Sequence, residues 1–422
     1  MSFTCPLTAA APRFSPPLRH FALAAASFWA FAAALFAGRN ALMGFGLDAR
    51  WALGATHLLT LGFLSVTMLG AMSQMLPAHG GAALRRPWAP ALGLWLLAAG
   101  LAVFVAELWL GARVYWRGPA LAAAALACYL SSYVPTLLAS PELPFTEKHF
   151  AAALAFLVSL AGVGVLLAVD RSRGALLPAP DHALIAHVHL ALVGWVSLAI
   201  IGASYRLFHP VALSRGANRL PSQAAFALLA AGTAGLAADA LLGGNRWPRV
   251  WALTLAAGYA CYLTQLRSLA KAKLRLDPPM AFTLVGILGG IVWAGLGLAL
   301  AFGLLEDRWE ARAAYGLCAL LGWATPWVLG QAHKIFPFLV WRSVYAESVD
   351  GPSFDALGRP ALAWTALATL ALGWPLCVAG LLRECQPALT AGLSLVLACA
   401  TAYALQSALW LSHLPWPRFS ES

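Results

Sequence analysis

The sequence predicts an all-α integral membrane protein of about twelve transmembrane helices, and three observations lead to that prediction. Hydrophobic residues make up 61% of the chain and charged residues only 10%, which is too little charge to cover a water-facing surface. The mean hydropathy of +0.76 lies far above that of ordinary globular domains. Apolar runs long enough to cross about 30 Å of hydrocarbon recur along the whole chain. No loop between them is long enough for a second domain, so we expect one membrane domain over 1–422.

Each predicted helix is an apolar run bounded by Pro, Gly, Arg or acidic residues. The first run has the same length as the later ones and no obvious cleavage site, so we interpret it as a retained helix rather than a signal peptide. The predicted spans are 20–38, 51–76, 89–109, 118–138, 149–169, 183–208, 222–243, 248–268, 279–303, 313–340, 360–382 and 387–412.

The basic residues lie in the short loops between the apolar runs. The net charge of +11 therefore indicates orientation in a lipid bilayer, and nucleic acid is not expected as a partner. If the amino terminus is cytoplasmic, all four lysines fall on the cytoplasmic side, and the positive-inside rule then predicts both termini in the cytoplasm. The seven cysteines include no C-x-x-C pair, which argues against a thiolate metal site.

Three segments of the sequence align around a pair of glycines spaced by eight residues. An aromatic residue follows the first glycine each time, and a proline (Pro77, Pro210 or Pro337) is expected to close each segment. The repeat predicts three related four-helix units over about 20–148, 149–278 and 279–412, whose small residues let neighbouring helices approach closely. The segments are LGFLSVTMLGAMSQMLP with Gly62 and Gly70, VGWVSLAIIGASYRLFHP with Gly194 and Gly202, and LGWATPWVLGQAHKIFP with Gly322 and Gly330.

Histidines toward the outer leaflet are the strongest candidates for function, because ionisable groups inside a membrane are costly. His57 and His189 each stand five residues before the first glycine of a repeat, so we expect them at the same depth as ligands of haem iron or copper. His187 and His189 project about 200° from one another on a helix and would serve two different cofactors. His182, five residues before His187, is a weaker candidate for a metal ligand. The simpler alternative is that these histidines bond neighbouring helices.

The remaining polar residues are assigned lesser roles. Six histidines are predicted near the cytoplasmic helix ends, where they would meet headgroups or cap helices. Glu107 and Asp239 are isolated acidic residues within helices. Gln74, Arg206 and Lys334 share one repeat position, where an anion or a quinol headgroup is a candidate ligand. The six histidines are His20, His79, His149, His209, His333 and His413.

The segment HVHLALVGWVSLAIIGASYRLFHP resembles the catalytic subunit of haem–copper oxidases and nitric oxide reductases, and is also similar to NnrS proteins. The resemblance implies an oxidase-like twelve-helix fold in the bacterial inner membrane. It further implies that His57 and His189 hold a low-spin haem b, with His187 as the ligand of a second haem or of copper. The chain departs from the oxidases because its H-x-H helix is the sixth rather than the tenth, and because it has no W-x-x-H-H helix.

The resemblance points to electron transfer or nitric oxide handling. The partners it implies are a quinol or cytochrome c as electron donor and a small gas ligand, NO or O2. The enzyme class it implies is an oxidoreductase. Two alternatives stay open. One is a transporter for a metal or small solute, for which Gly-interrupted helices are typical, although transporters use twofold repeats. The other is a cofactor-free scaffold that keeps an oxidase-like fold.

Overall fold

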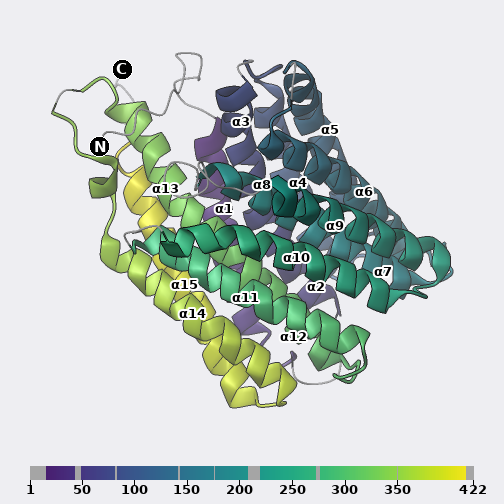
Figure 1. The fold of residues 1–422 in the computed structure, drawn as a ribbon. Helices are drawn as coiled ribbons and strands as arrows, with labels where there is room; N and C mark the ends of the chain where they lie inside the picture. The colour runs from purple at the N-terminus through teal and green to yellow at the C-terminus, as the bar shows by residue number, and fades with distance from the viewer. Residues whose placement is uncertain are drawn as a thin grey trace.

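The computed structural model describes residues 16–42, 49–80, 83–140, 143–174, 176–207, 219–271, 276–348 and 350–414. Within these ranges the chain is built from helices, with no β-strand among the described residues (Figure 1). The predicted all-α class is therefore confirmed. Pro77 and Pro337, which close two of the aligned segments, lie inside helices that continue to Gly80 and Val344. Pro210 lies outside the described residues.

Three of the helices long enough to cross the membrane contain a π-helical stretch between two α-helical stretches. We call each continuous membrane-crossing helix a rod. The three rods of this kind are α2 (Ala49–His57), η1 (Leu58–Ser65) and α3 (Val66–Gly80); α7 (Pro180–His189), η2 (Leu190–Ser197) and α8 (Leu198–Leu207); and α12 (Trp309–Leu317), η5 (Cys318–Ala324) and α13 (Thr325–Val344). The other long helices are α1 (Pro16–Ala37), α4 (Ala89–Trp109), α5 (Arg117–Leu138), α6 (Phe145–Arg173), α9 (Arg219–Ala238), α10 (Pro248–Lys271), α11 (Pro278–Ala301), α14 (Pro360–Leu382) and α15 (Gln386–Leu411).

Eleven rods among the described residues are long and apolar enough to cross a membrane, as a multi-pass membrane protein requires. The sequence predicts about twelve, and the difference is α10. This helix forms where 248–268 is expected, but it is less apolar than the others because Arg249, Gln265 and Arg267 interrupt its apolar residues. It pairs with α9, as α4 pairs with α5 and α14 with α15.

The three π-helices stand at one register of the sequence repeat. Each begins four residues before the first glycine of its segment, at Leu58, Leu190 and Cys318. His57 and His189 are thus the last α-helical residues before a π-helix. π-Helical stretches inside α-helices are rare and are frequent at functional sites, so this shared irregularity marks the region around the two histidines.

The helix that precedes each of these rods packs on both glycines of the repeat. A methyl group on Gly62 would lie 2.7 Å from Ser27, and one on Gly70 would lie 2.6 Å from His20, seven residues earlier on α1. The same spacing of seven recurs on the equivalent helices, so glycine is needed here for close helix approach. The contacting pairs are Gly62–Ser27 and Gly70–His20 on α1, Gly194–Phe156 and Gly202–His149 on α6, and Gly322–Gly289 and Gly330–Phe282 on α11.

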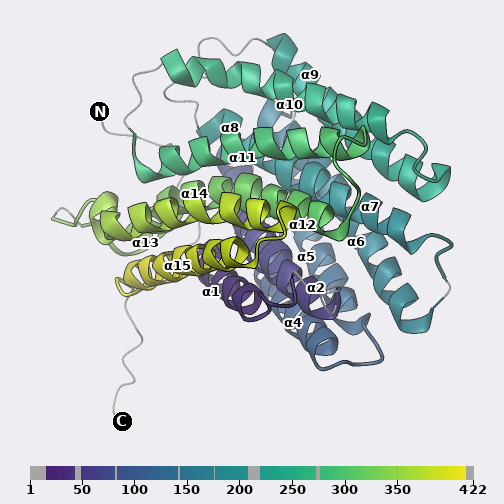
Figure 2. The ribbon, with the colours of Figure 1, turned by 90° about the horizontal axis from the view of Figure 1, so that it is seen from below.

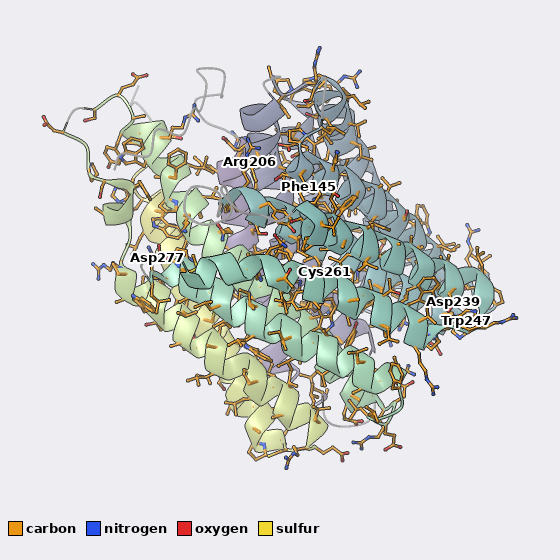
Figure 3. All side chains as sticks on the ribbon, viewed as in Figure 1. Phe145, Arg206, Asp239, Trp247, Cys261 and Asp277 are labelled. Atoms are coloured by element: carbon orange, nitrogen blue, oxygen red, sulfur yellow. The ribbon has the colours of Figure 1, made fainter. Side chains whose placement is uncertain are left out.

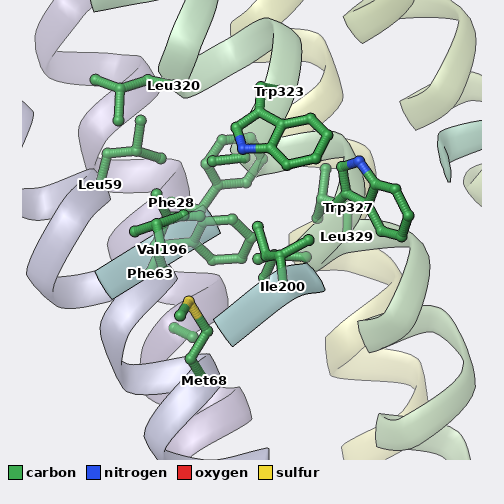
Figure 4. Close-up of a cluster of buried hydrophobic side chains, with 14 of the residues drawn as sticks. Phe28, Leu59, Phe63, Met68, Val196, Ile200, Leu320, Trp323, Trp327 and Leu329 are labelled. Carbon is green, nitrogen blue, oxygen red and sulfur yellow. The ribbon is translucent and has the colours of Figure 1, made fainter. Parts of the chain in front are cut away.

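The helices close into a ring. Neighbours in the sequence pack on one another at α5–α6 and α10–α11, and α15 packs on α1. Figure 2 shows α15 beside α1, so the first and the last of the labelled helices are neighbours. The three rods with π-helices meet inside this ring, where η2 contacts η5. Buried aromatic and aliphatic side chains, among them Phe28, Phe63 and Trp323, fill the space between them (Figure 4).

Two hydrogen bonds between buried side chains join these rods. The Trp195 indole N–H donates to Ser65 Oγ at 2.9 Å, and the Trp323 indole N–H donates to Ser197 Oγ at 2.8 Å. In each bond, the tryptophan directly follows the first glycine of its own segment. The serine stands three residues after the first glycine of the preceding segment. The third pair of such positions is Phe63 and Thr325, and phenylalanine has no group to donate.

We predict that Trp323→Phe lowers the free energy of unfolding by about 1–2 kcal/mol, because the hydrogen bond to Ser197 and some buried volume are lost. Phe63 at the equivalent position shows that phenylalanine suits this register. Unfolding in detergent measures the effect. Trp364→Phe on α14, where the indole is 41% exposed, is the control and should change little. Equal loss in the two variants would contradict the role of the bond.

Candidate functional site

His57 and His187 lie next to each other at the junction between the first two repeat segments. Their ring centres are 6.4 Å apart, and the ring planes are inclined by 33°. His57 ends α2, and His187 lies in the last turn of α7. Two imidazoles bound to one metal ion through bonds of about 2 Å have ring centres about 6 Å apart, so this separation is compatible with a shared metal.

The orientation of His57 is fixed by its backbone. Nδ1 donates to the Leu53 carbonyl one turn earlier at 2.8 Å, which assigns the N–H to Nδ1 and leaves the Nε2 lone pair available. The edge of Phe104 on α4 packs against the ring, with ring centres 5.1 Å apart. An imidazole whose other nitrogen bonds a carbonyl is the usual arrangement of a histidine metal ligand.

His187 packs against a glycine of α6. A methyl group on Gly164 would lie 2.9 Å from Cε1 and 3.4 Å from Nδ1 of the ring, so a larger residue at this position would displace the imidazole. Nδ1 of His187 is buried and has no hydrogen-bond partner among the described residues. The Leu160 carbonyl of α6, one turn before Gly164, is the backbone group that acts on this imidazole.

His189 faces a different helix. Nδ1 bonds the Ile185 carbonyl at 2.9 Å, and Nε2 is 3.1 Å from the Tyr315 hydroxyl on α12. His187 and His189 thus face different neighbours, as their two-residue spacing on a helix predicts, and their roles toward two cofactors stay a prediction. In the part of the chain that the structure describes, the histidine ring in contact with His57 is that of His187, and His189 contacts Tyr315. The resemblance implied instead that His57 pairs with His189.

The two contacts occupy equivalent positions of the repeat. His57 and His189 stand five residues before the first glycine of their segments, whereas His187 and Tyr315 stand seven residues before theirs. Each contact thus joins position minus five of one segment to position minus seven of the next. The remaining positions of this kind are Leu317 and Ala55, and neither side chain is a metal ligand. This cross-segment register cannot be read from the alignment alone.

Charged groups interact at the N-terminal ends of α7 and α12. The Arg312 guanidinium donates to both carboxylate oxygens of Asp307, at 2.6 and 2.7 Å. These bonds hold the pKa of Asp307 below its ordinary value. Asp181 of α7 also acts electrostatically on Arg312. His182, the weaker ligand candidate, lies in the first turn of α7 beside Asp181.

The histidines assigned to the cytoplasmic helix ends have mixed positions. His20 and His149 are both 0% exposed, so their expected headgroup role is wrong. Nε2 of His20 is 2.8 Å from the Tyr129 hydroxyl. His149 and His333 bond carbonyls of their own helices and pack among aromatic rings. His20 and His149 also pack against the repeat glycines Gly70 and Gly202, and a hydropathy pattern does not reveal these contacts. The side chains of His79 and His209 lie outside the described residues.

The acidic residues singled out in the sequence differ in role. Asp239 is structural, because its carboxylate accepts bonds from the backbone of Arg246 and Trp247 and from the Trp251 indole (Figure 3). Glu107 is buried, and neither carboxylate oxygen has a hydrogen-bond partner among the described residues. Glu107 lies one turn beyond Phe104, the residue that contacts His57.

The third set of predicted polar positions comprises Gln74, Arg206 and Lys334. Arg206 makes an ion pair with the buried Glu147 at 3.9 Å, and it lies near Phe145 in Figure 3. Within the described ranges, no group of three or more His, Cys, Asp and Glu side chains is arranged to hold a metal ion. A metal at the His57–His187 junction would have two protein ligands of these types from the described residues. This is the number that haem iron requires, since the porphyrin supplies the other four.

Comparisons with known proteins do not identify the chain. No protein-family model matches the sequence, and no curated protein matches it either.

We predict that Asp307→Asn lowers stability by less than about 1 kcal/mol at neutral pH, since the Asp307–Arg312 pair is largely exposed. Because the pKa of Asp307 is lowered in the folded protein, the contribution is present above the ordinary pKa and is lost as pH falls through the lowered value. Thermal unfolding against pH should show the variant and the wild type converging in acid. Asp350→Asn, at an exposed carboxylate, is the control. A difference that grew in acid would refute this assignment.

Proposed function

We propose that this protein binds haem b at the junction of its first two repeat segments, with His57 and His187 as the axial ligands. The observation that carries the proposal is the 6.4 Å separation of the two imidazole rings, which come from two different membrane-crossing rods. A haem with two histidine ligands joins helices across a membrane bundle in this manner. His57 and His187 thus replace the pair His57 and His189 that the resemblance implied.

The surroundings of the two rings suit this ligand. Nδ1 of His57 is bonded to a carbonyl, which leaves Nε2 for iron, and Gly164 makes room for His187. Arg50 stands seven residues before His57, on the same face of α2 and about 10 Å nearer the outer end of the helix. A cation in that position suits a haem propionate. The adjacent π-helix is the kind of irregularity that accompanies functional sites in helices.

The arrangement of the helices supports an oxidase-like fold as part of the same proposal. Each of the three segments has a π-helix at the same repeat position and a preceding helix that packs on its glycine pair. The surrounding helices close into a ring. We infer three pseudo-equivalent four-helix units, as in the catalytic subunits of haem–copper oxidases. The protein would then be a multi-pass protein of the bacterial inner membrane with both termini in the cytoplasm.

The haem would supply one-electron chemistry, and the protein would supply its position and its dry surroundings. The role that follows is electron transfer or nitric oxide handling, with a quinol or cytochrome c as donor. The His189–Tyr315 junction is the equivalent position between the second and third segments, and it would hold a second haem or copper that meets NO or O2. Within the described residues no three-histidine copper site is present, so reduction of O2 to water is not part of this proposal.

We predict that the purified protein from haem-replete cells shows a sharp b-type α band on reduction. His57→Ala and His187→Ala should each lose the band, because each removes one axial ligand. His189→Ala should retain it. His413→Ala is the matched control, since that ring bonds Tyr345 away from the pair. Optical spectra of the oxidised and dithionite-reduced proteins make the measurement.

Two results would count against the proposal in different ways. Loss of the band in His57→Ala and His189→Ala, with His187→Ala unaffected, would keep the haem and overturn the His187 assignment. A colourless wild type would overturn haem binding altogether and favour a transporter or a scaffold.

A further inference from the structure

A cavity of about 70 Å³ lies where α3, α8 and α13 meet inside the ring of helices. Its lining includes Met68, Met72 and Met75 of α3, which are half of the six methionines in the chain. Met68 and Met72 are 8% and 2% exposed. Met68 lies at the edge of the buried cluster near Ile200 (Figure 4). Leucine is the usual aliphatic residue elsewhere in this core, whereas three methionines line this one cavity. We therefore consider a role for them beyond packing.

The three methionines form one stripe along α3. Successive members are four and three residues apart, which places them about 6 Å and 4.5 Å apart along the axis and within about 60° of one another around it. A methionine side chain is long and unbranched, so three thioethers from such a stripe can turn toward one point in the cavity. Leucine has a similar volume but no sulfur, so packing alone does not require methionine here.

The chemistry of the lining selects the kind of ligand. Among the described residues, no Asp, Glu, His, Lys or Arg side chain lines the cavity, so none of them brings a charge or an imidazole to bind a hard divalent cation. Thr67 Oγ1 and Gln331 Oε1 also belong to the lining, and neither has a hydrogen-bond partner among the described residues. Buried oxygens of this kind mark a cavity that holds a polar occupant. Neutral thioether sulfurs favour a soft monovalent cation, which among biological metals is Cu(I).

We propose that Met68, Met72 and Met75 form a Cu(I) site in the central cavity. The site uses none of the histidines assigned to haem, and it lies on the other side of the Trp195–Ser65 bond along the same rods. Copper bound here would be held by thioethers alone, with the Gln331 amide oxygen close by in the lining. The proposal stands independently of haem binding.

The experiment is anaerobic loading of the full-length protein with Cu(I), followed by competition with bicinchoninate and measurement of retained copper. We expect about one retained Cu(I) per chain in the wild type. The triple variant Met68→Leu, Met72→Leu, Met75→Leu should retain at least tenfold less, because leucine keeps the volume and removes the sulfur. Met280→Leu on α11 is the matched control, since Met280 is also buried but does not line the cavity, and it should retain wild-type copper.

Further measurements separate this site from the haem site and from misfolding. The double variant His57→Ala, His187→Ala should keep its Cu(I), and X-ray absorption of the wild type should show sulfur neighbours at about 2.3 Å. If the triple variant does not purify as a single species, Met72→Leu alone should still weaken retention. Unchanged copper in the Met→Leu variants, nitrogen or oxygen neighbours in place of sulfur, or no copper in the wild type would overturn the proposal.

Discussion

Close approach of helix backbones at the repeated glycines is the constraint on which the rest of the structure depends. A bilayer offers no hydrophobic force between helices, so they associate through close packing and a few buried hydrogen bonds. Gly62 and Gly70 admit α1, and their counterparts admit α6 and α11. This contact sets the rotation of each central rod, and with it the direction in which its histidines point. The π-helix beside each first glycine keeps the backbone bonded while the register shifts.

The same constraint produces three junctions that are alike in geometry and different in chemistry. One carries His57 and His187 with the Ser65–Trp195 bond, and the next carries His189 and Tyr315 with the Ser197–Trp323 bond. At the third, the corresponding positions are Leu317 and Ala55. Substitution at a few repeat positions is therefore sufficient to vary the polar groups without altering the packing.

Much of this arrangement was predictable from the sequence. The hydropathy pattern locates nearly all the helices, and the glycine alignment locates the three rods that meet at the centre. The pairing of His57 with His187 was not predictable, because the alignment relates equivalent positions whereas the contact joins positions two residues out of register. The burial of His20 and His149 was missed for a similar reason. They sit at helix ends in a hydropathy plot, and only their fit against Gly70 and Gly202 shows that they face inward.

The two tryptophan–serine bonds connect segments that follow one another in the chain. The equivalent positions for a bond between the last and first segments are Thr325 and Phe63, and Thr325 Oγ1 is buried with no partner among the described residues. During synthesis the hydrogen-bonded junctions can thus form in the order in which the helices emerge. The ring is completed by contacts such as α15 on α1, between segments made earliest and latest. That seam carries hydrogen bonds of its own, from the Trp29 indole to Thr401 Oγ1 at 3.2 Å and from the Gln386 amide to the Arg39 carbonyl at 3.1 Å, and these bonds can form only after α15 has been synthesised.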